Sequence, residues 1–141
     1  MTTTEMAPTG RKGWTIVLWG GQVLLALAFG AAGVMKLGMP VEALAAQMNW
    51  VNSAPELLVR FIGLAEAAGA LGMIVPAATR ILPWLTPLAA LGFVVIQVLA
   101  IATHAMLGEL LMVLPVNLAL LALSGLVAWG RWRKAPIQPR R

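Results

Sequence analysis

Four apolar runs, each long enough to cross a lipid bilayer, make up most of this chain. They are Trp14–Met35, Pro55–Ala77, Trp84–Leu107 and Glu109–Gly130. A transmembrane helix needs about 20 predominantly apolar residues, and a helix satisfies its backbone hydrogen bonds without water. The sequence therefore predicts an all-α polytopic membrane protein, folded as a compact four-transmembrane-helix bundle.

Composition supports the membrane class and excludes several others. Hydrophobic residues make up 60% of the chain and charged residues only 11%, whereas soluble domains contain about 25% charged residues. The formal net charge of +5 could suggest nucleic acid, but the basic residues lie at the chain ends and beside the apolar runs. Such flanking charge is typical of membrane proteins. We therefore expect the lipid bilayer as the partner, and no nucleic acid.

The basic residues also predict an orientation. Arg11 and Lys12 precede the first run, Arg80 lies between the second and third, and five more basic residues follow the fourth. Because cytoplasmic flanks carry an excess of Lys and Arg, both termini are predicted to be cytoplasmic. This divides the chain into a disordered cytoplasmic tail over residues 1–13, a transmembrane domain over residues 14–130 and a basic cytoplasmic tail over residues 131–141.

The connection between the first two runs has its own pattern. Apolar residues recur at helical spacing over Val41–Val51, which predicts a short amphipathic helix on the outer surface. Ser53 and Glu56 have the spacing of a capping box, which would start the second span.

Small residues indicate which helices pack together. In lipid, helices associate where small side chains let their backbones approach. The first span carries Ala26, Gly30 and Gly33, and the second carries Gly63, Gly69, Ala70 and Gly72. We expect these two helices to pack backbone to backbone through these residues.

Three charged residues interrupt the apolar pattern in the outer half. Glu66 lies near the middle of the second span, where a carboxylate costs about 2.5–3.5 kcal/mol, so it must be paired, hydrated or protonated. It is either a ligand or proton site or a structural hydrogen bond between helices. Arg60 either pairs with Glu56 one turn away or contributes to a site. Lys36 either snorkels to the interface or contributes to the same site.

Polar residues of the last two spans lie at similar depth. Gln97 and His104 share one face of the third span, and His104 faces either Glu109, across the hairpin tip, or the bundle interior. Asn117 follows Pro115, where it could satisfy the carbonyl that the proline frees. The inner half is almost purely apolar. We therefore predict a polar pocket that opens outward and ends near Glu66, with ligand-binding residues Lys36, Arg60, Glu66, Gln97, His104 and Asn117, of which Glu66 and His104 would handle protons.

Missing residue types limit the chemistry further. The chain has no cysteine, no tyrosine and one histidine. This excludes a disulfide framework and thiol redox chemistry, and one histidine with scattered carboxylates does not predict a metal site. No cofactor motif is evident, and no feature predicts a homo-oligomer.

The motifs resemble those of a known family. The sequence GVMKL over Gly33–Leu37, the run PELLVRFIGLAEAAGALGMIVP over Pro55–Pro76, and Asn117 together resemble the DoxX and DoxX-like membrane proteins, over about residues 20–128. The resemblance implies that Lys36 and Glu66 match the family's lysine and glutamate, and that the chain is an integral protein of a bacterial plasma membrane. The family takes its name from a subunit associated with thiosulfate:quinone oxidoreduction, and a distant animal branch acts as a receptor-assembly chaperone.

Three functions remain open at this stage. The first is a membrane subunit of an oxidoreductase system that binds a small quinone- or lipid-like ligand, with the redox centres in a partner protein. The second is a non-catalytic membrane chaperone or assembly factor. The third is a membrane acid–base enzyme, an isomerase or cyclase, in which Glu66 acts on a lipid-like substrate.

Overall fold

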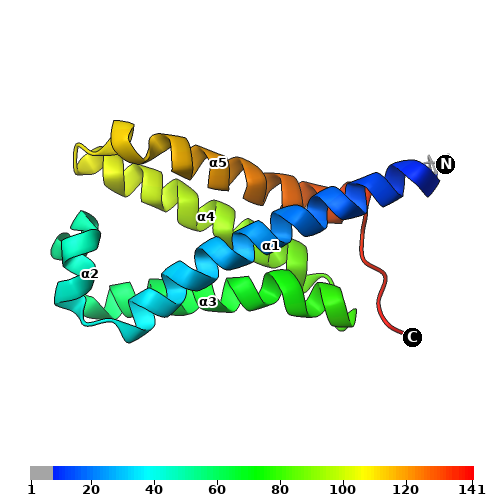
Figure 1. The fold of residues 1–141 in the computed structure, drawn as a ribbon, viewed down its shortest axis with the longest axis horizontal. Coiled ribbons are helices and arrows are strands. Elements are labelled where there is room, and N and C mark those ends of the chain that lie inside the picture. The colour runs from blue at the N-terminus through cyan, green and yellow to red at the C-terminus, as the bar shows by residue number, and fades with distance from the viewer. Residues whose placement is uncertain (1–7) are drawn as a thin grey trace.

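The structure, a computed structural model, describes residues 8–141, and its regular elements are all helices (Figure 1). Four of them are long: α1 (Pro8–Gly38), α3 (Glu56–Thr79), α4 (Leu85–Met106) and α5 (Leu110–Trp129). All four are long and apolar enough to cross a membrane. Three short elements complete the fold: α2 (Val41–Gln47), the 3-10 helix η1 (Asn49–Ser53) and the π-helix η2 (Gly130–Lys134). The predicted all-α membrane fold is confirmed.

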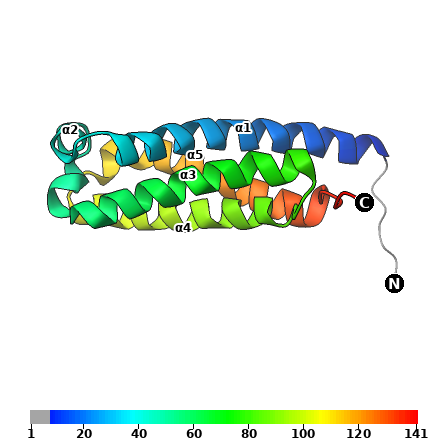
Figure 2. The ribbon, with the colours of Figure 1, turned by 90° about the horizontal axis from the view of Figure 1, so that it is seen from below.

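The long helices form two antiparallel pairs. Helix α1 packs mainly on α3, and α4 packs mainly on α5. The two pairs diverge toward the end of the bundle that carries α2 (Figure 1), while the start of α1 and the C-terminus lie at the opposite end (Figures 1 and 2). We call these the α2 end and the terminal end. The predicted short amphipathic helix is present at the α2 end, divided into α2 and η1, with Leu44 and Val51 buried.

Helices α1 and α3 meet backbone to backbone at one pair of glycines. A Cβ atom built on Gly33 would lie 2.7 Å from the Ala67 nitrogen and 2.8 Å from the Gly63 carbonyl oxygen. A Cβ atom on Gly63 would lie 2.7 Å from the Lys36 Cβ. All three distances are shorter than ordinary contacts, so any side chain at either position would push the helices apart. The predicted close packing of the first and second spans is present here.

Two of the small residues assigned to that interface instead face α4. A Cβ on Gly69 would overlap the Phe93 ring, and one on Gly72 would lie 2.9 Å from the Ala89 Cβ. The Phe93 ring in turn stacks on Phe29, with ring centroids 3.8 Å apart. The second span therefore uses one set of small residues toward α1 and another toward α4, because a helix in the middle of a bundle has two neighbours to approach.

The start of the chain differs from the sequence prediction. Helix α1 begins at Pro8, so residues 8–13 are helical, whereas the sequence suggested a disordered tail; residues 1–7 lie outside the described part. The proposed capping box is also wrong, because Ser53 belongs to η1 and Pro55, which precedes α3, makes no side-chain cap.

The C-terminal segment is held against the terminal end of the bundle. The Arg140 backbone N–H donates to the Arg80 carbonyl, 2.9 Å away, and Arg11 donates to the Pro136 carbonyl. Arg131, assigned to a basic tail, is instead only 4% exposed. These contacts tie the last residues to α1 and to the α3–α4 turn.

The glycine contact between α1 and α3 is directly testable. We expect Gly33→Ala to lower the free energy of unfolding by about 1–3 kcal/mol, the usual cost of overpacking. The matched control is Gly92→Ala on α4, where a built Cβ meets nothing within 4 Å; it should be neutral or slightly stabilising, because alanine is the better helix former. Thermal unfolding in detergent measures both, and equal effects of the two variants would contradict the close contact.

Candidate functional site

A buried ion pair joins α1 to α3 near the middle of the bundle. The Lys36 Nζ donates to the Glu66 Oε2 at 2.8 Å, and each side chain is only 7% exposed. Lys36 lies near the end of α1 and Glu66 near the middle of α3. Among the states that the sequence left open for Glu66, the structure shows the paired one. An ion pair removes most of the cost of placing each charge alone in hydrocarbon.

The local sequence positions this pair. Gly63 lies one turn before Glu66, and its missing side chain leaves room for the Lys36 Cβ. Without that space, α1 could not bring the lysine within hydrogen-bond distance of the carboxylate. The glycine contact and the ion pair are thus two parts of one interface.

Arg60 does not hydrogen-bond Glu66, but it holds the end of α1 that carries Lys36. Its Nη1 donates to the carbonyls of Lys36 at 2.6 Å and Met39 at 2.7 Å, and its Nη2 pairs with Glu56 at 2.9 Å. A cation at the carbonyl end of a helix is favourable because it compensates unpaired acceptors. Arg60 therefore orients the end of α1. It does not line the cavity described next, and it is the only predicted site residue that the cavity excludes.

The other predicted site residues surround a single cavity in the half of the bundle nearer α2. Its volume is about 240 Å³. Lys36 and Glu66 contribute from α1 and α3, Gln97 and His104 from α4, and Asn117 from α5. The remaining lining is mostly apolar and comes from Trp50, Ile62, Ile96, Leu99, Ala100 and Thr103. The sequence prediction placed these polar residues at a common depth, and the fold brings them to a common space.

Two residues that line the cavity each carry a buried polar atom without a hydrogen-bond partner among the described residues. These atoms are the Gln97 Oε1, an acceptor, and the Asn117 Nδ2, a donor. A buried polar atom without a hydrogen bond costs about 1–3 kcal/mol. Asn117 does not bond the carbonyl freed by Pro115, as the sequence had suggested, and its buried amide donor belongs to a side chain that lines the cavity.

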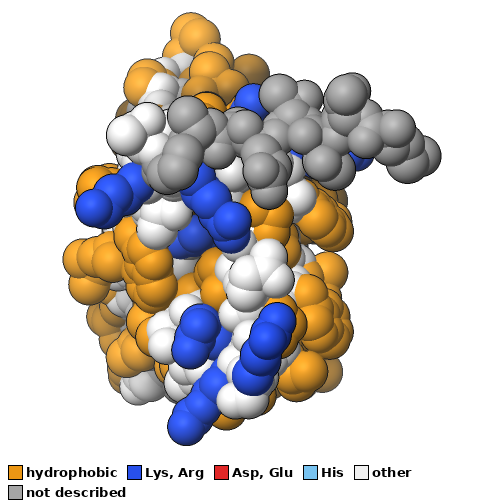
Figure 3. Space-filling model, turned by 90° about the vertical axis from the view of Figure 1, so that its right-hand side faces the viewer, with side chains coloured by type: hydrophobic (Ala, Val, Ile, Leu, Met, Phe, Trp, Pro, Cys, Tyr) orange, Lys and Arg blue, Asp and Glu red, His pale blue; other side chains and the backbone are white. Residues whose placement is uncertain are grey.

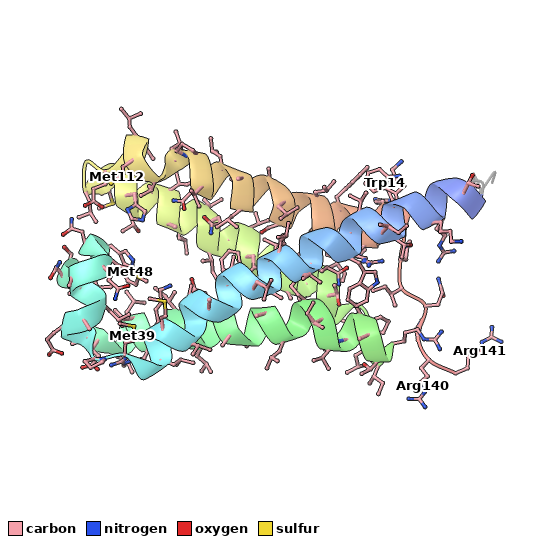
Figure 4. The ribbon with its side chains drawn as sticks, viewed as in Figure 1. Trp14, Met39, Met48, Met112, Arg140 and Arg141 are labelled. Atoms are coloured by element: carbon pink, nitrogen blue, oxygen red, sulfur yellow. The ribbon has the colours of Figure 1, made fainter. Side chains whose placement is uncertain are left out.

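A chain of hydrogen bonds links η1 to the turn between α4 and α5 at the α2 end, near the cavity. The His104 Nδ1 lies 3.2 Å from the Glu109 Oε2, and the Asn49 Nδ2 donates to the Glu109 Oε1. His104 therefore makes both of the contacts that the sequence left open, to Glu109 and to the cavity. Asn49 precedes Trp50, which lines the cavity. Figure 4 shows the elements joined here, with Met48 beside α2 and Met112 at the start of α5.

A second buried polar cluster lies toward the terminal end, and sequence analysis missed it. The Gln22 Nε2 donates to the Met73 carbonyl at 2.6 Å, and the Arg131 Nε donates to the Gln22 Oε1 at 2.6 Å. The Arg131 guanidinium also lies over the Trp19 ring. The half of the bundle nearer the termini, which the sequence analysis took as the inner half, is therefore not purely apolar. Gln22 inside the first apolar run was a detectable signal, whereas nothing in the sequence separates Arg131 from the other basic residues near the C-terminus.

Fold and site together define an integral membrane protein: four helices enclose a small, mixed polar and apolar cavity with a buried ion pair in its wall. Among the described residues, no group of three or more His, Cys, Asp or Glu is placed to hold a metal ion.

The family follows from comparison with known proteins. The sequence model of the DoxX-like family matches residues 21–127, and the chain belongs to this family. The match spans the glycine contact, the ion pair and every polar residue of the cavity. Searches of curated proteins and of solved structures found no significant match.

The ion pair makes a specific prediction about stability. Removing one partner of a buried pair leaves an uncompensated charge, so Lys36→Met should cost about 3–5 kcal/mol. The double variant Lys36→Met/Glu66→Leu removes both charges and should regain much of that loss. Thermal or denaturant unfolding in detergent gives the coupling between the two sites. Additive effects of Lys36→Met and Glu66→Leu would show that the two side chains do not interact.

Proposed function

We propose that this DoxX-like protein binds a small apolar molecule with a polar head, most specifically a quinone, in the cavity beside Lys36 and Glu66. The observation that carries the proposal is the pair of unpartnered atoms, Gln97 Oε1 and Asn117 Nδ2, in two residues that line the cavity. A ligand that bonds both atoms would recover free energy that the ligand-free protein lacks.

The polar side of the cavity matches the head of a quinone. A quinone carbonyl oxygen accepts hydrogen bonds, which the Asn117 amide and the Lys36 ammonium can donate. The hydroxyl of the reduced form donates, and the Gln97 Oε1 can accept. The Lys36–Glu66 pair carries no net charge, which suits an uncharged ligand. The same wall can therefore hold both redox forms.

The size and the apolar side support a ring-sized head group. Ligand cavities usually measure about 300–1,000 Å³, and this one, at about 240 Å³, suits a single ring better than a whole lipid. Ile62, Ile96 and Leu99 supply apolar contacts, and the exposed side chain of Leu99 leads from the cavity to the lipid-facing surface. An isoprenoid tail would leave the cavity there.

The composition supports an indirect part in electron transfer. The chain has no cysteine and one histidine, so we place the redox centres in a partner oxidoreductase for which this protein would be the quinone-binding membrane subunit. In this proposal Glu66 and His104 relay the protons that quinone reduction consumes, with the Glu66 carboxylate taking up a proton before passing it on, and Arg60 positions Lys36 through the end of α1.

The binding test compares the same exchange, glutamine to leucine, at two positions. A soluble short-chain ubiquinone should raise the melting temperature of the detergent-purified protein, because a ligand that binds only the folded state stabilises it. Gln97→Leu should abolish this rise while leaving ligand-free stability equal or higher by about 1–3 kcal/mol, since it removes the unpartnered acceptor. Gln47→Leu, on the exposed surface of α2, should keep the full rise.

Other outcomes discriminate the alternatives. A full rise in the Gln97→Leu variant would refute the cavity as the binding site. Mass spectrometry of small molecules that copurify with the protein extends the test. A stable protein complex with no retained ligand would favour the chaperone, and a retained lipid that is chemically converted by wild-type protein but not by Glu66→Gln would favour the acid–base enzyme.

We also propose that the terminal end faces the cytoplasm of a bacterial cell. The described basic residues at this end include Arg11, Lys12 and Arg80, together with those that follow α5. Figure 3 looks on to this end and shows Lys and Arg side chains, with no acidic side chain in view among the described atoms. This asymmetry is the signature of a cytoplasmic face.

The orientation is testable by labelling, because the chain contains no natural cysteine. A cysteine introduced at Gln47 should react with a membrane-impermeant thiol reagent in intact cells. A cysteine at Gln138 should react only after the cells are opened, since both positions are exposed in the structure but lie at opposite ends. The reverse labelling pattern would overturn the orientation.

A further inference from the structure

A second hollow lies at the terminal end, on the outer face of the α4–α5 pair. Its volume is about 590 Å³. Leu91 and Val94 of α4 form one wall, and Gly125 and Ala128 of α5 form the other. A Cβ built on Gly125 meets nothing within 4 Å, so this glycine leaves open space and is not required by helix packing. We call this hollow the α4–α5 groove.

The lining of the groove becomes more polar toward the terminal end of the bundle. Trp129 and Trp132, which are 46% and 56% exposed, border it there, and Arg133 completes the lining. Tryptophan favours the level of the lipid head groups. Arg133 is exposed and makes no hydrogen bond or ion pair within the described part of the chain. The groove thus runs from an apolar floor in the hydrocarbon region to a free guanidinium at the interface.

The positive charge around the groove favours an anionic lipid. Within the described residues, the carboxylates Glu42, Glu56, Glu66 and Glu109 all lie in the α2 half or near the middle of the bundle. The terminal end exposes basic side chains instead (Figure 3). A second copy of this chain would bring the same basic surface to the groove, which charge repulsion disfavours. An anionic lipid brings an acyl chain for the floor and a phosphate for Arg133.

We infer that the α4–α5 groove is a binding site for one anionic glycerophospholipid, with an acyl chain along Leu91, Val94 and Gly125 and the phosphate at Arg133. A guanidinium donates two parallel hydrogen bonds to phosphate oxygens. A net negative head group adds attraction to the surrounding basic residues, which a zwitterionic head group lacks. The site is separate from the central cavity and does not depend on the ligand proposed there.

The experiment compares two lipids with identical acyl chains. Purified protein is titrated in detergent with phosphatidylglycerol or phosphatidylcholine, and the bound lipid is counted by native mass spectrometry. Wild-type protein should retain one phosphatidylglycerol in preference to phosphatidylcholine. Arg133→Gln should reduce phosphatidylglycerol affinity about fivefold, the contribution of one basic residue near an anionic surface. Arg141→Gln removes the same charge outside the groove and should retain the preference.

A second pair of variants tests the floor of the groove. Gly125→Leu fills it and should abolish retention of the lipid without lowering the melting temperature. Gly92→Leu places the same side chain in open space on α4 and should leave retention unchanged. Equal retention of the two lipids by the wild type would overturn the inference, as would an equal loss in Arg133→Gln and Arg141→Gln. Conversion of a dimer to a monomer by Gly125→Leu would also overturn it, because the groove would then hold a second copy of the chain.

Discussion

The close approach of α1 and α3 at Gly33 and Gly63 is the constraint on which the rest of the structure depends. In hydrocarbon the two helices gain nothing from burying apolar side chains, so association needs close packing and polar contacts. The glycine contact supplies the packing and simultaneously brings Lys36 to Glu66 at 2.8 Å. The ion pair then makes the contact specific, because sliding either helix by one turn would leave two charges alone in the membrane.

The same two helices are joined again nearer the terminal end, here by side-chain hydrogen bonds. Gln22 of α1 bonds the Met73 carbonyl of α3, and Arg131 bonds Gln22 from the end of the last helix. The proline at position 76 removes one backbone donor in this part of α3, and Thr86 bonds the Gly72 carbonyl that it leaves free. Polar contacts therefore hold α3 to α1 and α4 where its own ladder is interrupted.

The α4–α5 pair diverges from the α1–α3 pair toward α2, and this leaves space between the two pairs. The cavity lies there because the two helix pairs are held together near the terminal end and joined at the α2 end through Asn49, Glu109 and His104. Its wall keeps Gln97 and Asn117 without partners, which a purely structural core would avoid. A protein that gives up stability at one location usually does so where it binds something.

The sequence alone determined the helix number, the membrane class, the approximate spans and the depth of the polar residues. These depend on hydrophobic run length and on residue order along single helices, and both can be read without tertiary structure. It also indicated that Gly33 and Gly63 belong to an interface. By contrast, only the tertiary structure decided that Glu66 pairs with Lys36, that Gly69 faces α4, that Arg60 caps α1 and that Arg131 is buried. Each of these depends on the rotation of one helix against another. In a helix that is apolar on all sides, the sequence carries little information about that rotation, because the lipid-facing and the packed faces are made of the same residue types.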